Sequence, residues 1–206
     1  MKHYRTVSLH LTLEADRIQD FFPLLQRGVM VKVQVGCSIK TMLCKQWGLG
    51  TEYVEERVKT IFLDGKTVDD IDSAVIKDGS TLALSAAMPG LAGAILRRGG
   101  PLASLRSQTT HREEKKYSSR GEGMVVLKLF NLIATELGPR FLKEGIHVRR
   151  EDLYSYLKSF PEEFWAGCKL AEVDDQEVSL DYLMSMKWLE KYDLVMLRVE
   201  GDVARA

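Results

Sequence analysis

The chain has 206 residues, of which 45% are hydrophobic and 28% charged, a composition typical of one globular domain or two small ones. Lys and Arg total 29, as do Asp and Glu, so the net charge is +0 and a strongly basic nucleic-acid-binding protein is not indicated. No stretch reaches the roughly 20 apolar residues of a membrane span, and residues 1–5 (MKHYR) lack a signal-peptide core, so we expect a cytoplasmic protein.

The first half of the chain predicts a mixed sheet with one main helix. Apolar residues alternate over 6–13 (TVSLHLTL) and over 29–35 (VMVKVQV), the period of two that is typical of half-buried strands. Ser38 is the expected N-cap of the helix. Its apolar stripe is Ile39, Met42, Leu43 and Trp47. A hairpin turn is predicted at Asp64–Gly65 and a last strand over 81–85.

The second half shows a similar succession. A strand is predicted over 125–130, followed by a short helix over 132–137 that ends at Gly138–Pro139, because proline disrupts a helix interior. A longer helix is expected over 150–160. Two closing strands are predicted over 169–173 and 194–199.

Residues 97–123 are predicted to form a basic flexible linker between two domains, 1–96 and 124–206. From Arg97 to Arg120, seven Lys/Arg and two Asp/Glu give 7 − 2 = +5, which leaves 22 − 27 = −5 for the rest. Few apolar side chains in the segment could offset the entropy of ordering it. A basic strip can contact nucleic acid or anionic lipid, but Tyr117 is its single aromatic residue, so we favour a solvated linker.

Several motifs resemble the β-grasp fold of the ubiquitin-like superfamily, and most closely its MoaD/ThiS sulfur carriers of molybdopterin and thiamine synthesis. In the first half these are residues 61–68 (IFLDGKTV), 76–84 (IKDGSTLAL) and a tail at 88–94 (MPGLAGA). In the second half they are residues 125–137, 170–178 and 192–199. The resemblance implies an α+β protein with two tandem β-grasp domains, the first ThiS- or ubiquitin-like and the second MoaD-like.

The resemblance also implies a carrier function rather than an enzyme, with no cofactor of its own. A carrier of this family presents a terminal glycine carboxylate to an adenylating activating enzyme. Here the corresponding di-glycine is internal: Gly99–Gly100 follows Arg97 and Arg98, which would supply docking charge, and precedes Pro101. A processing protease would therefore have to cut a Gly–Pro bond. A molybdopterin-synthase-type large subunit is a further expected partner, and neither a membrane nor a nucleic acid is expected.

Two alternatives to this interpretation stay open. Gly93–Ala94 lies at the family's distance from the last strand, although alanine replaces the second glycine. Alternatively, both pairs are hinge glycines at the start of the linker, and the protein is a ubiquitin-like interaction module that is never activated. Residues 199–206 contain no di-glycine, so we do not expect activation at residue 206.

Other residue patterns give weaker signals. Cys37, Cys44 and Cys168 are an odd set without paired spacing, which indicates reduced thiols. Cys37 could have a lowered pKa at a helix N-terminus, but a buried core thiol is the commoner case. The four histidines show no metal-ligand spacing; they are His3, His10, His111 and His147. The acidic turn at Asp174–Asp175 is interpreted as solvated, and Met184, Met186 and Trp188 as core.

Overall fold

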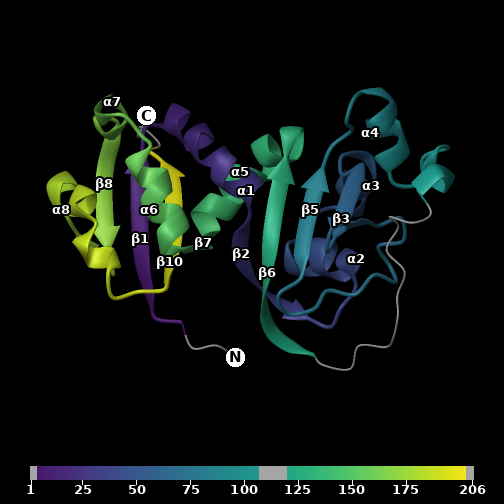
Figure 1. Ribbon diagram of the computed structural model, residues 1–206, viewed down its shortest axis with the longest axis horizontal. Helices are drawn as coiled ribbons and strands as arrows, with labels where there is room; N and C mark the ends of the chain where they lie inside the picture. Colours follow the sequence, from purple (N-terminus) through teal and green to yellow (C-terminus); the bar gives the residue numbers. More distant parts are fainter. Residues whose placement is uncertain (1–3, 107–119, 203–206) are drawn as a thin grey trace. The chain divides into compact units, whose positions relative to one another are not determined.

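The computed structural model describes residues 4–106 and 120–202, which form an α+β protein. Its internal contacts divide the chain into two compact units. Unit 1 combines residues 1–24 with residues 137–206, whereas unit 2 runs from residue 25 to residue 136. Unit 1 is therefore discontinuous in sequence and takes its elements from both ends of the chain (Figure 1).

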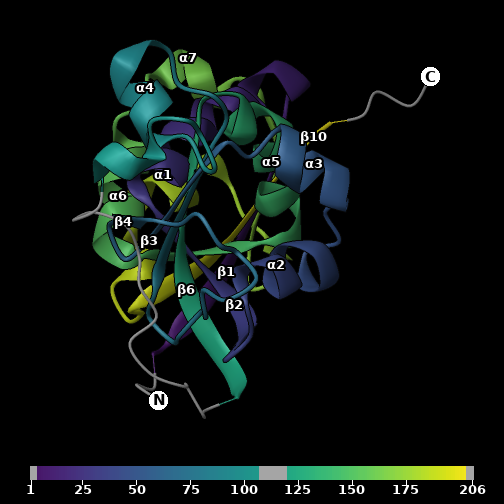
Figure 2. The ribbon, with the colours of Figure 1, turned by 90° about the vertical axis from the view of Figure 1, so that its right-hand side faces the viewer.

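Unit 2 is a mixed sheet with the strand order β4-β3-β5-β6-β2. Its strands are β2 (Val29–Val35), β3 (Thr60–Leu63), β4 (Lys66–Thr67), β5 (Thr81–Ser85) and β6 (Gly121–Phe130). The long strand β6 is antiparallel to β2 and parallel to β5, while β3 pairs antiparallel with both β5 and β4. Figure 1 shows β6 between its two neighbours, and Figure 2 shows it beside β2.

Short helices accompany this sheet. They are α2 (Ile39–Thr41), the π-helical turn η2 (Met42–Gln46), α3 (Thr51–Glu56), α4 (Gly90–Leu96) and the 3-10 turn η3 (Ala103–Arg106). The chain passes from one unit to the other within α1 (Phe22–Arg27) and within α5 (Asn131–Glu144).

Unit 1 also contains five strands of mixed direction, in the order β7-β10-β1-β8-β9. Its strands are β1 (Thr6–Leu13), β7 (Ile146–Arg149), β8 (Cys168–Val173), β9 (Gln176–Glu177) and β10 (Leu194–Gly201). β1 lies between β10, to which it is parallel, and β8, to which it is antiparallel. The helical elements are η1 (Ala15–Phe21), α6 (Arg150–Lys158), α7 (Glu162–Trp165), α8 (Leu180–Ser185) and η4 (Lys187–Leu189).

An aromatic cluster joins the two chain segments of unit 1. Phe21, from the N-terminal segment, lies with its ring centroid 6.0 Å from that of Tyr156 and 5.6 Å from that of Phe160. Phe160 in turn stacks on Phe164 at 4.0 Å. Because aromatic side chains bury a large apolar area, this cluster stabilises the association of residues 1–24 with the C-terminal part of the chain.

The prediction of two tandem β-grasp domains is wrong. The strands of the two halves are interleaved: β1 pairs with β10 and β8 of the second half, while β6 pairs with β2 and β5 of the first half. The expected blocks 1–96 and 124–206 are therefore not the compact units. The alternation of apolar residues identified which face of each strand is buried, but it carries no information about which strand is its neighbour.

Most of the individual elements were predicted correctly. β1 and β2 have the expected bounds, and all four alternate valines of β2 are buried. The Ser38 hydroxyl caps the helix by accepting a hydrogen bond from the Thr41 N–H at 3.2 Å. The turn at Asp64–Gly65 has positive φ at both residues, as its hairpin requires.

The predicted end of the helix at Gly138–Pro139 is wrong. α5 continues through both residues to Glu144, and Pro139 lies inside it. Leu137, Phe141 and Leu142 are buried around the proline. Their burial in a continued helix offsets the hydrogen bond that proline cannot make.

Candidate functional site

Gly99 and Gly100, the predicted activated terminus, lie in a closed turn of unit 2. Gly99 has φ +61° and donates its N–H to Asp69 Oδ1 at 3.1 Å. The N–H of Gly100 donates to the carbonyl oxygen of Arg97 at 3.2 Å. A carrier tail would be presented in an extended conformation. The left-handed backbone of Gly99 and the hydrogen bond from Gly100 back to Arg97 form a turn instead.

The two predicted docking arginines differ in their surroundings. Arg97 is exposed. Arg98 is bound to the body of unit 2, because its N–H donates to the carbonyl of Lys59 at 2.8 Å and its Nη2 donates to the carbonyl of Val54 at 3.0 Å. The charge that was expected to face a partner is therefore partly used to hold the turn in place.

The alternative pair, Gly93 and Ala94, lies inside helix α4 rather than in a tail. Gly93 is buried, and a Cβ at this position would lie 2.0 Å from the carbonyl oxygen of Met88. Glycine is required here because the helix begins against its own preceding backbone. The structural role of Gly93 is thus the packing of α4.

The described part of the predicted linker is also bound to unit 2. The Arg106 side chain is 2% exposed and lies 2.5 Å from Asp69 Oδ1. It also donates from Nε to the carbonyl of Ile95 at 2.7 Å and from Nη2 to that of Arg97 at 3.1 Å. Residues 97–106 therefore do not form the free linker that was expected, while residues 107–119 lie outside the described part of the chain.

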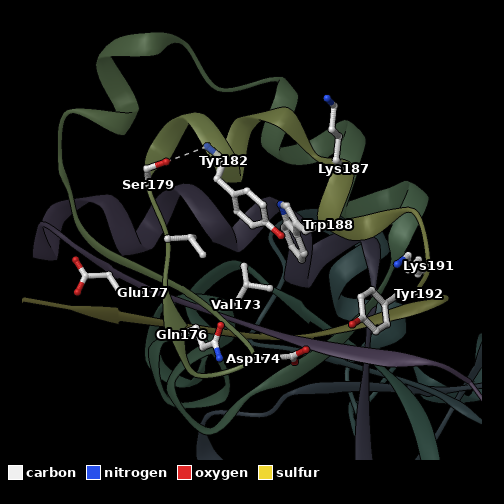
Figure 3. A pocket seen from close by; sticks show the side chains of 11 residues that line it. Val173, Asp174, Gln176, Glu177, Ser179, Tyr182, Lys187, Trp188, Lys191 and Tyr192 are labelled. Atoms are coloured by element: carbon white, nitrogen blue, oxygen red, sulfur yellow. Dashed lines mark hydrogen bonds between the residues drawn. The ribbon is translucent and has the colours of Figure 1, made fainter.

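A groove of about 690 Å³ in unit 1 is the second region of interest (Figure 3). It lies beside β9, the last strand in the order of this sheet. Its lining residues come from the β8–β9 hairpin, from α8 and from the segment after α8. They are Val173, Asp174, Gln176, Glu177, Val178, Ser179, Tyr182, Lys187, Trp188, Lys191 and Tyr192.

Local backbone features fix the two sides of the groove. On the strand side, Asp174 and Asp175 form a tight turn with φ of +48° and +60°. The Asp174 carboxylate also accepts the N–H of Ser8 at 3.0 Å, which attaches this turn to β1. On the helix side, the Ser179 hydroxyl caps α8 by accepting the N–H of Tyr182 at 3.2 Å.

Aromatic side chains line the helix side. Trp188 is 6% exposed, and its Nε1 donates to the carbonyl of Leu183 at 3.0 Å, so its ring is a fixed part of the groove. Tyr182 beside it is 47% exposed (Figure 3). A buried indole next to an exposed phenol ring offers apolar contact together with a polar edge, which is the character of binding surfaces.

The charges around the groove are divided between its sides. Asp174 and Glu177 come from the hairpin, whereas Lys187 and Lys191 come from the segment after α8, and all four are exposed. The described residues that line the groove include neither Cys nor His. The arrangement can bind a ligand that carries both charges and apolar groups, and it presents none of the usual nucleophile–base pairs.

The sequence pattern indicated parts of this groove but did not connect them. Trp188 was expected in the core and is buried, and the Asp174–Asp175 turn was expected to be solvated and is exposed. Tyr182 and Tyr192 were missed. The signal that could have found Tyr182 is the Ser179 N-cap, which begins a short helix with exposed apolar residues at Leu180 and Tyr182.

Cys37 does not show the lowered pKa that a helix N-terminus could produce. It lies in a smaller hollow of unit 2 and is partly buried. Burial raises the pKa of the Cys37 thiol, and the hydrogen bond from the Gln46 amide at 3.1 Å opposes this effect only in part. Its thiol donates to the carbonyl of Gln34, so a structural role accounts for its contacts.

Comparison with known proteins adds no relative: no protein-family model matches the chain, and neither a curated protein nor a solved structure matches it. Within residues 4–106 and 120–202, no group of three or more His, Cys, Asp or Glu side chains could hold a metal ion. No helix in the same residues is long and apolar enough to cross a membrane. The geometry of the turn and of the groove is therefore the basis for a functional assignment.

Proposed function

We propose that the protein is a binding module that holds an extended segment of a partner polypeptide in the groove beside β9. The observation that carries this proposal is the position of an aromatic groove next to the free edge of a sheet. Among residues 4–106 and 120–202, β9 has a strand neighbour on one side only, since it ends the strand order of unit 1. An extended peptide can add to such an edge through its backbone while its side chains enter an adjacent hollow.

The size and chemistry of the groove support this ligand. A volume of about 690 Å³ accommodates a few side chains of a peptide. An aromatic or aliphatic side chain would contact Tyr182 and Trp188. Basic and acidic flanking residues would face Asp174 and Lys191, respectively, from the two sides. Charge on both sides of the groove then fixes the direction in which the peptide lies.

A function as an activated carrier is the second candidate, and its requirements are stricter. It needs hydrolysis of the Gly100–Pro101 bond by a protease, followed by adenylation of Gly100 by an activating enzyme. The observation that favours it is the exposure of Gly99 and Arg97 at the surface of unit 2. Opposing it are the hydrogen bonds of Gly99 and Arg98, all of which would have to break first.

A displayed library of random dodecapeptides, selected against the full chain, tests the binding proposal. We expect enriched peptides with a shared apolar residue, and we expect their affinity to fall at least about tenfold for Tyr182→Ala, because a central aromatic contact is lost. Tyr154→Ala is the matched control: Tyr154 is 46% exposed in the same unit but lines a different hollow.

Three outcomes would contradict the proposal. One is a selection that yields no common sequence. Another is a set of peptides that bind wild-type protein and Tyr182→Ala equally. Loss of binding in Tyr154→Ala but not in Tyr182→Ala would likewise move the site away from β9.

A further inference from the structure

We propose that Asp69 and Arg106 form a latch that keeps the Arg97–Gly100 motif closed, so that no processing or activating protein can engage it until this ion pair opens. The inference goes beyond the binding function and does not depend on it. It concerns a conformational control in unit 2, whereas the proposed groove lies in unit 1.

A single carboxylate oxygen joins the latch to the turn. Asp69 Oδ1 accepts the N–H of Gly99 at 3.1 Å and also lies 2.5 Å from Arg106 Nη2. Arg106 reaches back to the carbonyl of Arg97, the first residue of the motif, at 3.1 Å. Asp69 and Arg106 thus hold the motif at Gly99 and at Arg97, respectively.

Burial makes this pair more than a surface ion pair. The Arg106 side chain is 2% exposed and that of Asp69 is 35% exposed. A charge as buried as Arg106 depends on its partners, so the loss of the Asp69 carboxylate would weaken the contacts that hold Arg106 inside the unit. We expect η3 and the turn then to detach from unit 2 together, because this returns the guanidinium to water.

The closed state keeps the motif out of the extended form in which proteases and activating enzymes take up a substrate chain, although Arg97 and Gly99 are exposed. Gly99 is in the left-handed region, and the Arg98 side chain is held by the Val54 carbonyl. Cleavage after Arg97 or Arg98 therefore requires the opened state. When opening and closing are fast, the cleavage rate follows the population of that state.

Limited digestion of the full chain with trypsin, followed by mass spectrometry, measures this population. The readout is the rate at which peptides ending at Arg97 or Arg98 appear. We expect Asp69→Asn to raise this rate about tenfold or more. Arg106→Lys, which keeps the charge but cannot reach all three acceptors from one nitrogen, should raise it by less.

Asp72→Asn is the matched control, since Asp72 is a nearby carboxylate that pairs with Lys40 at the surface. It should leave the rate unchanged. Equal rates in wild type, Asp69→Asn and Asp72→Asn would overturn the latch. If circular dichroism shows that Asp69→Asn is unfolded, amide hydrogen exchange of the wild-type chain decides: slow exchange at Gly99 and Gly100 supports the latch, and exchange at the rate of an unstructured chain refutes it.

Discussion

The Arg97–Gly100 turn of unit 2 and the groove beside β9 in unit 1 use the same kinds of residue in opposite ways. At the turn, Arg98 and the neighbouring Arg106 of η3 donate to carbonyl groups of their own unit. In the groove, Lys187 and Lys191 are exposed at the surface. The comparison teaches that a conspicuous motif gives little information about function until the partners of its side chains are known.

Glycines show the same contrast. Gly93, Gly99 and Gly100 looked like the tail of a carrier, yet each one serves the packing or the turn of residues 90–106. The groove was built without any glycine among its lining residues. The glycines of residues 90–106 therefore serve local folding. The open surface of the protein is the groove beside β9.

The largest expected effect tests whether the groove is preformed. Trp188→Ala should lower the free energy of unfolding by about 3 kcal/mol or more, because a buried indole and its hydrogen bond to Leu183 are both lost. Denaturant unfolding measures this change. Trp188→Phe keeps much of the apolar contact and should cost clearly less. A loss below about 1 kcal/mol for alanine would mean that the groove floor is not part of the core.

A somewhat smaller effect tests the packing of α4. Gly93→Ala should destabilise unit 2 by about 2 kcal/mol, since its Cβ would meet the Met88 backbone. Gly121→Ala is the control, because a Cβ there meets no atom of the described residues within 4 Å. Thermal unfolding of both variants gives the comparison. An unchanged unfolding midpoint for Gly93→Ala would contradict the packing role of this residue and support its assignment to a mobile tail.

The two neighbouring arginines sharpen the comparison within the turn itself. Arg98→Ala should lower the free energy of unfolding by about 1 kcal/mol, because the hydrogen bond to the Val54 carbonyl is lost. Arg97→Ala should change stability by less than about 0.5 kcal/mol, because its side chain is exposed. Equal losses in denaturant unfolding would show that both arginines contribute alike to the closed turn.

The smallest expected effect concerns acid stability in unit 2. Glu136 accepts hydrogen bonds from Arg57 and from Tyr53, and the bond from Arg57 is the main cause of the lowered pKa of this carboxyl. A lowered native pKa contributes stability above the unfolded-state pKa of about 4.3, and this contribution is lost as the pH falls through the native pKa.

Glu136→Gln should therefore reduce stability at neutral pH by less than about 1 kcal/mol and flatten the decline of stability below about pH 5. Unfolding midpoints measured from pH 7 down to pH 3 give the profile. An unchanged acid-side slope would show that the Arg57–Glu136 pair forms no net stabilising contact. Arg57 would then differ from Arg98 and Arg106, whose charges are used within the unit.

The sequence predicted local structure better than it predicted pairing. The valines of β2, the Ser38 cap and the Asp64–Gly65 turn were correct because each depends on neighbouring residues. The partner of β1 is β10, almost the whole chain away. The entropic cost of closing a loop rises only slowly with the length of the loop. Pairing of β1 with a strand close in sequence is therefore not strongly favoured over pairing with a distant one.

The site was predicted less well, and for a related reason. Arg106 was assigned to a linker because its neighbours are polar, but its burial depends on Asp69, 37 positions earlier. Tyr182 and Tyr192 line the same groove as Val173 only because the chain folds back after β9. Side chains that come together through tertiary structure leave no spacing in the sequence that could be recognised in advance.

Intact-mass spectrometry of the protein purified from its native host tests the central claim most directly. The claim is that the chain acts through an open groove while the Gly100–Pro101 bond stays whole. We expect each observed species to retain Pro101 joined to Gly100. A species that ends at Gly100, above all one with sulfur in place of a carboxylate oxygen, would contradict this account and establish the carrier function.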